Sequence, residues 1–467
     1  MATRNKDIQT DTDQVIKTEK AKSPSSQPLS VPTDNPVVYP LDLPQGEARL
    51  RTPAVGQRAS RPDGRLHGLG QTQYIDDITF PHMLHAKILH SDHAHARIVS
   101  IDTSEAEKMP GVLATLTGAE VPENSFGPTF QDQPILAYPI VRHRGDGVAA
   151  VAAVTEQLAT EALEKIKVEY EPLTPVFDPL EAIEDDSPKI HGESNIYTSK
   201  IIKKGNVEKA LKDSPHVFHR QYRTQMVEHV PLEPQATIAS WDGNGRVTIW
   251  SSLGRITLGR EDISRTLAIP QSRIRLIGTI VGGNFGGKNE IRNEPIVALL
   301  SKKSRRPVKC VFTRDEEFTS STIRHPFIMD YTTGVNDEGL ILARKIRLVL
   351  DGGAYCSWTG TTIGKGSILA PGPYNIENVF VEAYAVYTNK TTTGAMRGFG
   401  APQVCFAYES QMDEIAHKLG IDPLEIRLKN GFSENSLSPT SQTLQSVALK
   451  ESLNQASDRF GWKEWKA

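Results

Sequence analysis

The spacing of apolar residues divides the chain into two structured regions. Short apolar runs predict strands over residues 84–89, 148–154 and 165–170, and helical spacing predicts a helix over residues 155–163. These elements indicate a compact α+β unit over residues 50–180. Residues 181–196 contain Pro, Asp and Gly with little periodicity, which is typical of a linker between domains.

A second mixed α+β unit is predicted over residues 197–467. Strands are expected over residues 237–241, 246–251, 344–350 and 379–387, helices over 261–267, 294–303 and 407–419, and a final helix over 444–460. Residues 1–48 are rich in polar residues and proline and contain few large apolar ones. Such a segment cannot bury enough surface to offset its ordering entropy, so it is predicted to be disordered or to wrap a partner.

Composition narrows the classes of function. The 53 Lys and Arg residues against 56 Asp and Glu residues give a net charge of -3, which does not support a nucleic-acid partner or a polybasic membrane surface. Cys310, Cys356 and Cys405 form no Cys-x-x-Cys pair, so this chain cannot supply the four thiolates of an iron–sulfur cluster. The odd number of cysteines, with no signal peptide and no long apolar stretch, predicts a cytoplasmic protein without membrane insertion.

The most informative local feature is a glycine loop at residues 279–290. A strand-like apolar run ends in four glycines placed around Phe285. Glycines permit positive φ and close approach of a ligand, and a helix starting after Glu290 would aim free N–H groups at the same place. The pattern therefore favours an anion, above all a phosphate.

Two alternatives remain for this loop. Gly282 to Lys288 match the G-x-x-x-x-G-K part of an ATP-binding P-loop, but Asn289 stands where that loop requires Ser or Thr to hold Mg²⁺. A tight strand-to-helix turn without any ligand is the other alternative.

A second glycine cluster, residues 394–400, follows the strand predicted to end at Tyr387. The two loops together resemble the two cofactor loops of the molybdenum hydroxylases, the xanthine dehydrogenase and aldehyde oxidase family. The resemblance extends in family order through Arg61-Pro62-Asp63-Gly64, Ser91-Asp92-His93-Ala94-His95-Ala96, Arg144-Gly145-Asp146-Gly147, Arg324-His325-Pro326-Phe327 and Ile421-Asp422-Pro423-Leu424. It therefore covers nearly all of the chain after residue 50.

The resemblance implies an α/β hammerhead domain over residues 50–180, followed by the first molybdopterin-binding domain. It implies a molybdenum pterin cofactor, molybdopterin cytosine dinucleotide in bacteria, which the following residues would contact: Gly282, Gly283, Phe285, Gly286, Gly287, Arg397, Gly398 and Gly254. Substrate contacts are expected from Phe399, Lys365 and Asn289, and no residue of this chain is expected to bind the metal directly. Structural roles remain open for Phe399 as a core residue and for Arg397 as a capping or ion-pair residue.

Departures from the family pattern bear on the substrate. Gly254 stands where xanthine-oxidising members carry a glutamine near the metal, Asn289 where they carry a glutamate and Lys365 where they carry an arginine. A lysine can neutralise a carboxylate, so an N-heteroaromatic acid such as a pyridine carboxylate is favoured over a neutral aldehyde. A solvated Lys365 in a glycine-rich loop is the alternative.

The resemblance also implies partners. The family's catalytic glutamate lies near the end of a much longer subunit, so neither Glu233 nor Glu290 is expected to be the base. A second molybdopterin-binding subunit is expected to supply it, and further subunits to carry [2Fe-2S] clusters and FAD. The expected reaction is hydroxylation of a nicotinate-like or purine-like ring with oxygen from water. The alternatives are an aldehyde or aromatic acyl-CoA oxidoreductase, carbon monoxide dehydrogenase, which is disfavoured because the second loop lacks a cysteine, and a noncatalytic assembly subunit.

Overall fold

The structure, a computed structural model, describes residues 61–466. The described residues divide into a short first unit, which ends at Gln71, and a second unit, which begins at Thr72. The described part of the first unit contains α1 (Gly64–Gly68). The arm predicted over residues 1–48 lies outside the described residues. Among the described residues, no helix is both long enough and apolar enough to cross a membrane.

The second unit contains a seven-stranded sheet that draws strands from both predicted domains. Its order is β11 (Ile274–Gly278), β10 (Val247–Ser251), β9 (Ala236–Trp241), β12 (Val308–Val311), β1 (Leu84–His90), β5 (Gly147–Ala153) and β3 (Val112–Thr117). β1 pairs in parallel with β12, which joins the segment around residue 85 to that around residue 309. The sheet is thus continuous across the linker predicted at residues 181–196, whose role as a domain boundary stays a prediction.

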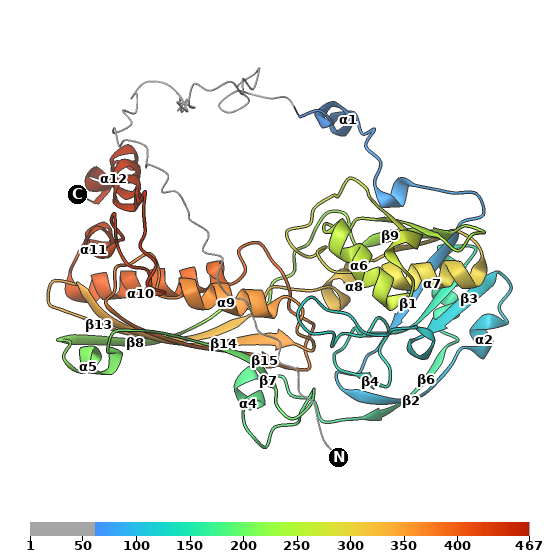
Figure 1. Cartoon of the computed structure of the whole chain (residues 1–467), viewed down its shortest axis with the longest axis horizontal. Coiled ribbons are helices and arrows are strands. Elements are labelled where there is room, and N and C mark those ends of the chain that lie inside the picture. The colour runs from blue at the N-terminus through green and yellow to red at the C-terminus, as the bar shows by residue number, and fades with distance from the viewer. Residues whose placement is uncertain (1–60, 467) are drawn as a thin grey trace, which may run out of the picture. The chain divides into compact units, whose positions relative to one another are not determined.

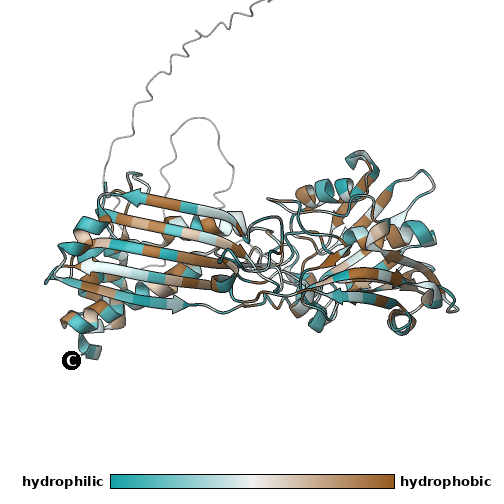
Figure 2. Ribbon diagram, turned by 90° about the horizontal axis from the view of Figure 1, so that it is seen from below, coloured by the Kyte–Doolittle hydropathy of each residue, from teal (hydrophilic) through white to brown (hydrophobic). Residues whose placement is uncertain are grey.

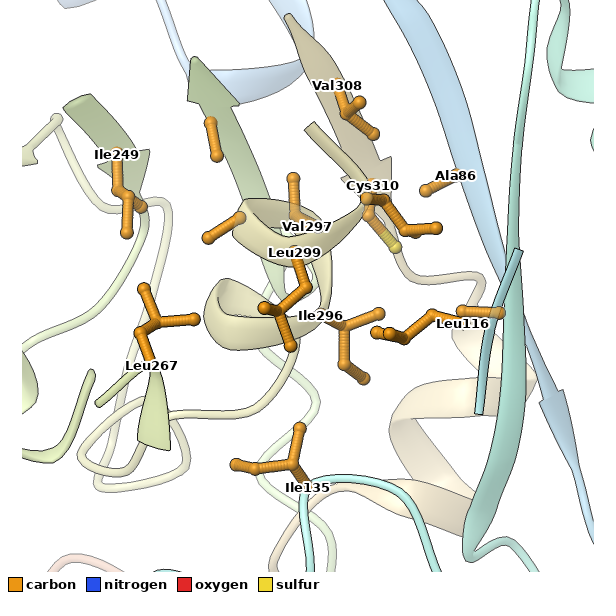
Figure 3. Packing of buried hydrophobic residues seen from close by; sticks show 14 of the residues in the cluster. Ala86, Leu116, Ile135, Ile249, Leu267, Ile296, Val297, Leu299, Val308 and Cys310 are labelled. Atoms are coloured by element: carbon orange, nitrogen blue, oxygen red, sulfur yellow. The ribbon is translucent and has the colours of Figure 1, made fainter. Parts of the chain in front are cut away.

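Helix α7 (Glu294–Ser304) fills the centre of the largest apolar core. Ile296, Val297 and Leu299 project from it towards side chains of the sheet and of the loop at Ile135 (Figure 3). Full burial of each such side chain contributes about 1.5–3 kcal/mol to folding. Because the first glycine loop runs directly into α7, this core fixes the position of one end of the loop.

A small three-stranded sheet lies beside the large one, in the order β4 (Ile140–Val141), β2 (Ala96–Asp102) and β6 (Lys167–Pro172). Two helices, α2 (Ser104–Glu107) and α3 (Glu156–Leu163), pack on β3 and on β1 and β5. The remaining short helical turns here are η1 (Ile75–Asp77), η2 (Gly118–Glu120) and η3 (Gln271–Arg273).

The third sheet has five strands, in the order β7 (Ile196–Lys204), β15 (Asn378–Tyr387), β14 (Ile341–Gly353), β13 (Phe327–Val335) and β8 (His216–Arg223). Hydrophobic and hydrophilic stretches succeed one another along its strands (Figure 2). Helices α9 (Thr359–Leu369) and α10 (Ala401–Leu419) cover one face, and α4 (Pro179–Ala182) and α5 (Val207–Lys212) lie on the other (Figure 1). The second glycine loop lies between β15 and α10, so this sheet positions it.

The other helices are α6 (Ile256–Thr266), α8 (Arg314–Ser320), α11 (Pro423–Asn430), α12 (Leu449–Phe460) and α13 (Trp462–Lys466). The last of these is held to the chain by Trp462, whose Nε1 donates to Asp422 at 3.3 Å. Cys405, an exposed cysteine, lies on α10.

The predicted strands are confirmed, but three helices start at residues other than those predicted. α6 begins at Ile256 instead of residue 261, α10 begins at Ala401 instead of residue 407, and α12 begins at Leu449 instead of residue 444, whereas α7 begins at Glu294 as predicted. In α10, Gly400 takes a left-handed φ of 87° and Pro402 lies in the first turn, where its missing N–H costs nothing.

Candidate functional site

The first glycine loop, residues 279–290, lies in the connection between β11 and α7, which spans residues 279–293. Gly283 and Gly286 have φ values of 106° and 113°, and Phe285 between them has a φ of 51°. A left-handed conformation is unfavourable for an aromatic residue, so the surrounding contacts must hold it there. Phe285 is also 50% exposed, which leaves its ring free to face a ligand or partner.

Two polar side chains fix the loop. Asn284 Oδ1 accepts from the backbone N–H of Gly286 at 2.8 Å and of Lys288 at 3.3 Å, an Asx-type turn. Glu233 Oε2 accepts from Gly282 N at 2.8 Å and from Lys288 Nζ at 2.9 Å. These bonds span both ends of the loop and make it a rigid element.

Lys288 is not available to a phosphate. Its side chain is 0% exposed and its ammonium is committed to Glu233. Burial lowers the pKa of Lys288, although the bond to Glu233 opposes this shift. The P-loop alternative is therefore wrong.

The start of α7 is also occupied. The buried carboxylate of Glu294 accepts from Ser251 Oγ at 2.6 Å and from Arg292 N at 2.7 Å. A carboxylate in the first turn satisfies the positive end of the helix dipole. Glu294 thus already balances part of the positive end of α7, and the expectation that this helix N-terminus faces a ligand stays a prediction.

The structure brings the two glycine loops together. Arg397 N donates to Phe285 O at 2.8 Å. A Cβ added at Gly286 would lie 2.3 Å from Ala395 O, so only glycine permits this approach. Phe399 has a φ of 48°, the same left-handed conformation as Phe285.

Buried His229 bridges the two loops. Its Nε2 donates to Ala395 O at 2.8 Å, and a Cβ at Gly287 would lie 3.0 Å from its ring. Glu228 lies 3.7 Å from the other ring nitrogen. Burial alone would raise the pKa of Glu228, but hydrogen bonds with His229 and Val230 outweigh it and hold that pKa low.

The loops offer donors suited to an anionic or oxo group. Within the described part of the chain, the N–H groups of Gly283, Phe285 and Gly398 make no hydrogen bond. Adjacent unpaired backbone donors around positive-φ residues form a concave site for anions. The residues present therefore fit a phosphorylated pterin, with the exposed Arg397 at the edge of the site.

Gly254 lies against the first loop. Its N–H donates to Lys288 O at 2.7 Å, and a Cβ there would lie 1.9 Å from Asn284 Nδ2. That same Nδ2 lies 3.5 Å from Asn289 Oδ1. The Asn284 amide thus occupies the space that any larger side chain at position 254 would need.

A pocket of about 230 Å³ opens beside Asn289. Its lining includes Leu258, Asp262, Asn289, Glu290 and Trp358. Arg255 stacks on Trp358, with its guanidinium 4.4 Å from the ring centroid. Phe399 meets Trp358 edge to face at 6.5 Å between centroids, which connects the second loop to the pocket wall.

Two carboxyl groups of this pocket have perturbed acidity. Burial raises the pKa of Glu290, and the nearby Arg292 and the hydrogen bond from Ser357 only partly offset it. Burial raises the pKa of Asp262 to about 6 against the opposing effect of Arg265. Such shifts are common in functional sites, and they also occur in structural clusters.

Lys365 is placed differently from the prediction. It belongs to α9 and not to a glycine-rich loop, and its side chain is exposed. Its neighbour Gly366 lies against Gly400 of the second loop, 3.9 Å from an added Cβ to the Gly400 Cα. Lys365 is therefore close in sequence to the loop contact, but neither Lys365 nor Phe399 lines the pocket beside Asn289.

Sequence reasoning does not identify His229, Arg324, Arg255 and Trp358 as site residues. Arg324 Nη2 donates to Arg397 O at 3.0 Å and so holds the second loop. In the sequence, Arg324 stands out only as part of a family motif. A histidine or tryptophan distant in sequence gives no local pattern, so the tertiary fold alone reveals these contacts.

Two regions of the chain match models of known protein families. The model of the molybdopterin cofactor-binding domain matches residues 190–431. The model of the aldehyde oxidase and xanthine dehydrogenase a/b hammerhead domain matches residues 69–174.

The chain resembles the nicotinate dehydrogenase large molybdopterin subunit of Eubacterium barkeri, with 37% identity over 87% of this chain and 96% of that one. It is also 37% identical to a protein of Bacillus subtilis named as a probable xanthine dehydrogenase subunit, over 86% of this chain and 55% of that one. Among solved structures, the aldehyde oxidoreductase of Desulfovibrio gigas matches with a TM-score of 0.84 and 29% identity, over 87% of this chain and 46% of that one. Quinoline 2-oxidoreductase of Pseudomonas putida 86 matches with a TM-score of 0.83 and 29% identity, over 88% and 55% of the two chains. The chain thus spans about half the length of several of these relatives and nearly all of one.

Proposed function

Since the chain belongs to the xanthine dehydrogenase and aldehyde oxidase family, with a hammerhead domain and a molybdopterin-binding domain, we propose that it is the molybdopterin-binding subunit of a multi-subunit molybdenum hydroxylase. Its reaction is the hydroxylation of an N-heteroaromatic ring with oxygen from water.

The meeting of the two glycine loops carries this proposal. The bond from Arg397 N to Phe285 O and the close approach at Gly286 bring the two loops into contact, and each loop has N–H groups that are unpaired among the described residues. Gly282, Gly283, Gly287 and Gly398 keep the backbone free of side chains around them. Such donors suit the pyrophosphate and oxo groups of a molybdopterin cytosine dinucleotide, and Arg397 adds a cation that pairs with phosphate.

When bound, the molybdenum pterin supplies the redox chemistry by which oxygen from water is transferred to the ring. The chain's own residues bind and orient the substrate. Trp358 presents aromatic surface to a flat ring in the pocket beside Asn289, whose amide can hydrogen-bond a ring nitrogen or a carbonyl, and Phe399 packs on Trp358 from outside that pocket. Lys365 is proposed to attract a carboxylate on the ring.

Neither Glu233 nor Glu290 is proposed as the catalytic base, because each has a structural partner. Glu233 accepts hydrogen bonds from Gly282 N and Lys288 Nζ. Glu290 is buried, accepts a hydrogen bond from Ser357 and lies 3.6 Å from Arg292. We therefore place the base on a second molybdopterin-binding subunit, with the [2Fe-2S] clusters and FAD on further subunits of a cytoplasmic complex.

The test uses the complex purified from its own host through a tag on this chain. The complex is incubated in H₂¹⁸O with an artificial electron acceptor and with nicotinate, hypoxanthine or benzaldehyde. The proposal predicts a hydroxylated product carrying ¹⁸O from nicotinate or hypoxanthine. Turnover of benzaldehyde alone would favour the alternative, an aldehyde oxidoreductase.

One observation favours a second candidate, a noncatalytic assembly subunit. Gly254 lacks the side chain that xanthine-oxidising members place near the metal, and the Asn284 amide fills that space. A complex of full composition that contains molybdenum but converts none of the three compounds would favour a different substrate, whereas one without molybdenum would favour this second candidate.

A further inference from the structure

Arg292 is a buried cation in the segment that leads into α7. It is 8% exposed, and its backbone N–H donates to the Glu294 carboxylate at 2.7 Å. Within residues 61–466, neither Nε nor Nη2 of its guanidinium has a hydrogen-bond acceptor. Burial of a charged donor without a partner is costly, so such groups are normally paired or bound to a ligand. The guanidinium therefore needs an acceptor in the space that it faces.

The carboxylate closest to pairing with Arg292 does not supply this acceptor. Glu290 Oε2 lies 3.6 Å from Arg292 Nη2, which is too far for a hydrogen bond. Glu290 lines the pocket beside Asn289, whereas Arg292 lines a different cavity. Burial also raises the pKa of Glu290, which favours its neutral form. A neutral Glu290 leaves the charge of Arg292 unbalanced.

The cavity that Arg292 lines has a volume of about 50 Å³. A buried water needs about 10–15 Å³ on this measure, so the space suits about four waters or one small ion. Much of the wall is apolar and buried, and it includes Ile88, Phe126, Ile135, Ile296 and Phe312. Gln133 and Ser320 add an amide and a hydroxyl that can both donate hydrogen bonds.

The other titratable groups that line the cavity are already paired. His90 Nε2 lies 3.3 Å from Glu316 Oε1, and His143 Nε2 lies 2.9 Å from Asp146 Oδ1. The Asp146 carboxylate also accepts from Tyr355 OH at 2.9 Å. Each carboxylate thus has an imidazole against it, and Arg292 carries the charge of this cavity that lacks a hydrogen-bonded partner among the described residues.

We propose that the cavity binds a small monovalent anion, chloride in the cell, on the unpaired guanidinium N–H groups of Arg292. The Gln133 amide and the Ser320 hydroxyl complete the surroundings of the ion. The small volume and the Asp146 carboxylate in the wall disfavour a larger, doubly charged anion such as sulfate.

The ion would join two parts of the fold. The cavity wall draws residues 88–147 from the region that matches the hammerhead model and residues 292–320 from the region that matches the molybdopterin-binding model. Phe126 lines both this cavity and the pocket beside Asn289, so the ion also supports one wall of that pocket. A ligand that binds only the folded chain stabilises it by mass action, and chloride should therefore stabilise this junction.

The test measures chloride bound per chain by equilibrium dialysis with ³⁶Cl⁻. The complex is purified from its own host through a tag on this chain and is first freed of chloride in sodium gluconate. Wild-type complex should bind chloride saturably. Arg292→Gln should weaken this binding by about tenfold or more, as expected when hydrogen bonds to a charged group are lost.

Arg265→Gln is the matched control. Arg265 lies on α6, lines the neighbouring pocket and pairs with Asp262 at 3.6 Å, so its replacement removes the same charge without touching the cavity. It should weaken chloride binding by less than about twofold. Equal affinity in the wild type and Arg292→Gln, or an equal loss in both variants, would overturn the proposal.

Bromide gives a second readout that does not depend on whether a variant folds. Crystals of the wild-type complex grown in sodium bromide should show an anomalous peak within hydrogen-bonding distance of the Arg292 guanidinium. Water at that place, with bromide confined to the protein surface as an adventitious ion only, would contradict the proposal. Neither readout requires bound molybdenum, so failure of the anion site and failure of the proposed function are distinguishable.

Discussion

Replacement of Gly286 by alanine should separate the two glycine loops. Gly286 has a φ of 113°, and the added methyl would lie 2.3 Å from Ala395 O. The left-handed backbone costs about 1–3 kcal/mol for a residue with a side chain. Separation of the loops also removes the bond from Arg397 N to Phe285 O, worth about 1 kcal/mol. The sum of about 2–4 kcal/mol corresponds to a roughly 30- to 1,000-fold loss of affinity for the cofactor.

The assay is molybdenum per chain in the purified complex, with thermal unfolding measured in parallel. Gly420→Ala is the matched control, since Gly420 has a φ of 66° at the end of α10 but no atom within 4 Å of an added Cβ. Gly420→Ala should lower the melting temperature and keep the metal, whereas Gly286→Ala should lose most of it. A metal content for Gly286→Ala equal to that of the wild type, or equal losses in both variants, would refute the reasoning.

Three further variants probe the pocket and the substrate. Folding raises the pKa of Asp262 from 3.8 to about 6. The protonated carboxyl therefore stabilises the folded state fully below pH 3.8, and this stabilisation is lost as pH rises through 6. Asp262→Asn should therefore unfold at a higher temperature than the wild type at pH 8, by up to about 3 kcal/mol in free energy before solvent screening reduces it, and by only about a third of that at pH 4.5; no difference at pH 8 would contradict this. Lys365→Ala should raise KM for nicotinate about two- to fivefold, but not KM for the neutral nicotinamide, and an unchanged KM for nicotinate would show the assignment to be wrong. Glu290→Gln should leave the pH–rate profile in place, because the base is assigned to the partner, and a lost limb of the profile would return that role to Glu290.

The strands and the two glycine loops are predictable from the sequence because both follow from local rules. Alternating apolar residues give β9, β10 and β15, and glycines next to phenylalanine give turns with positive φ. The start of α10 is harder to place because Pro402 suggests a break, although proline is favoured in a first helical turn.

The hydrogen bonds that join distant parts of the sequence at the site cannot be predicted in the same way. His229 lies 166 residues from Ala395, and Lys288 lies 55 residues from Glu233. Only the packing of the sheets brings such residues together. The glycine-rich segment around Lys365 is also misleading, since its high glycine content predicts a loop whereas packing against Gly400 and the sheet holds it as α9.

The most direct test of the account is the molybdenum content of the wild-type complex that co-purifies with this chain from its own host, normalised to the concentration of the chain. The account predicts close to one molybdenum per chain. Molybdenum near zero in an intact complex of several subunits would contradict it, because the meeting of the two loops would then serve a purpose other than holding the cofactor.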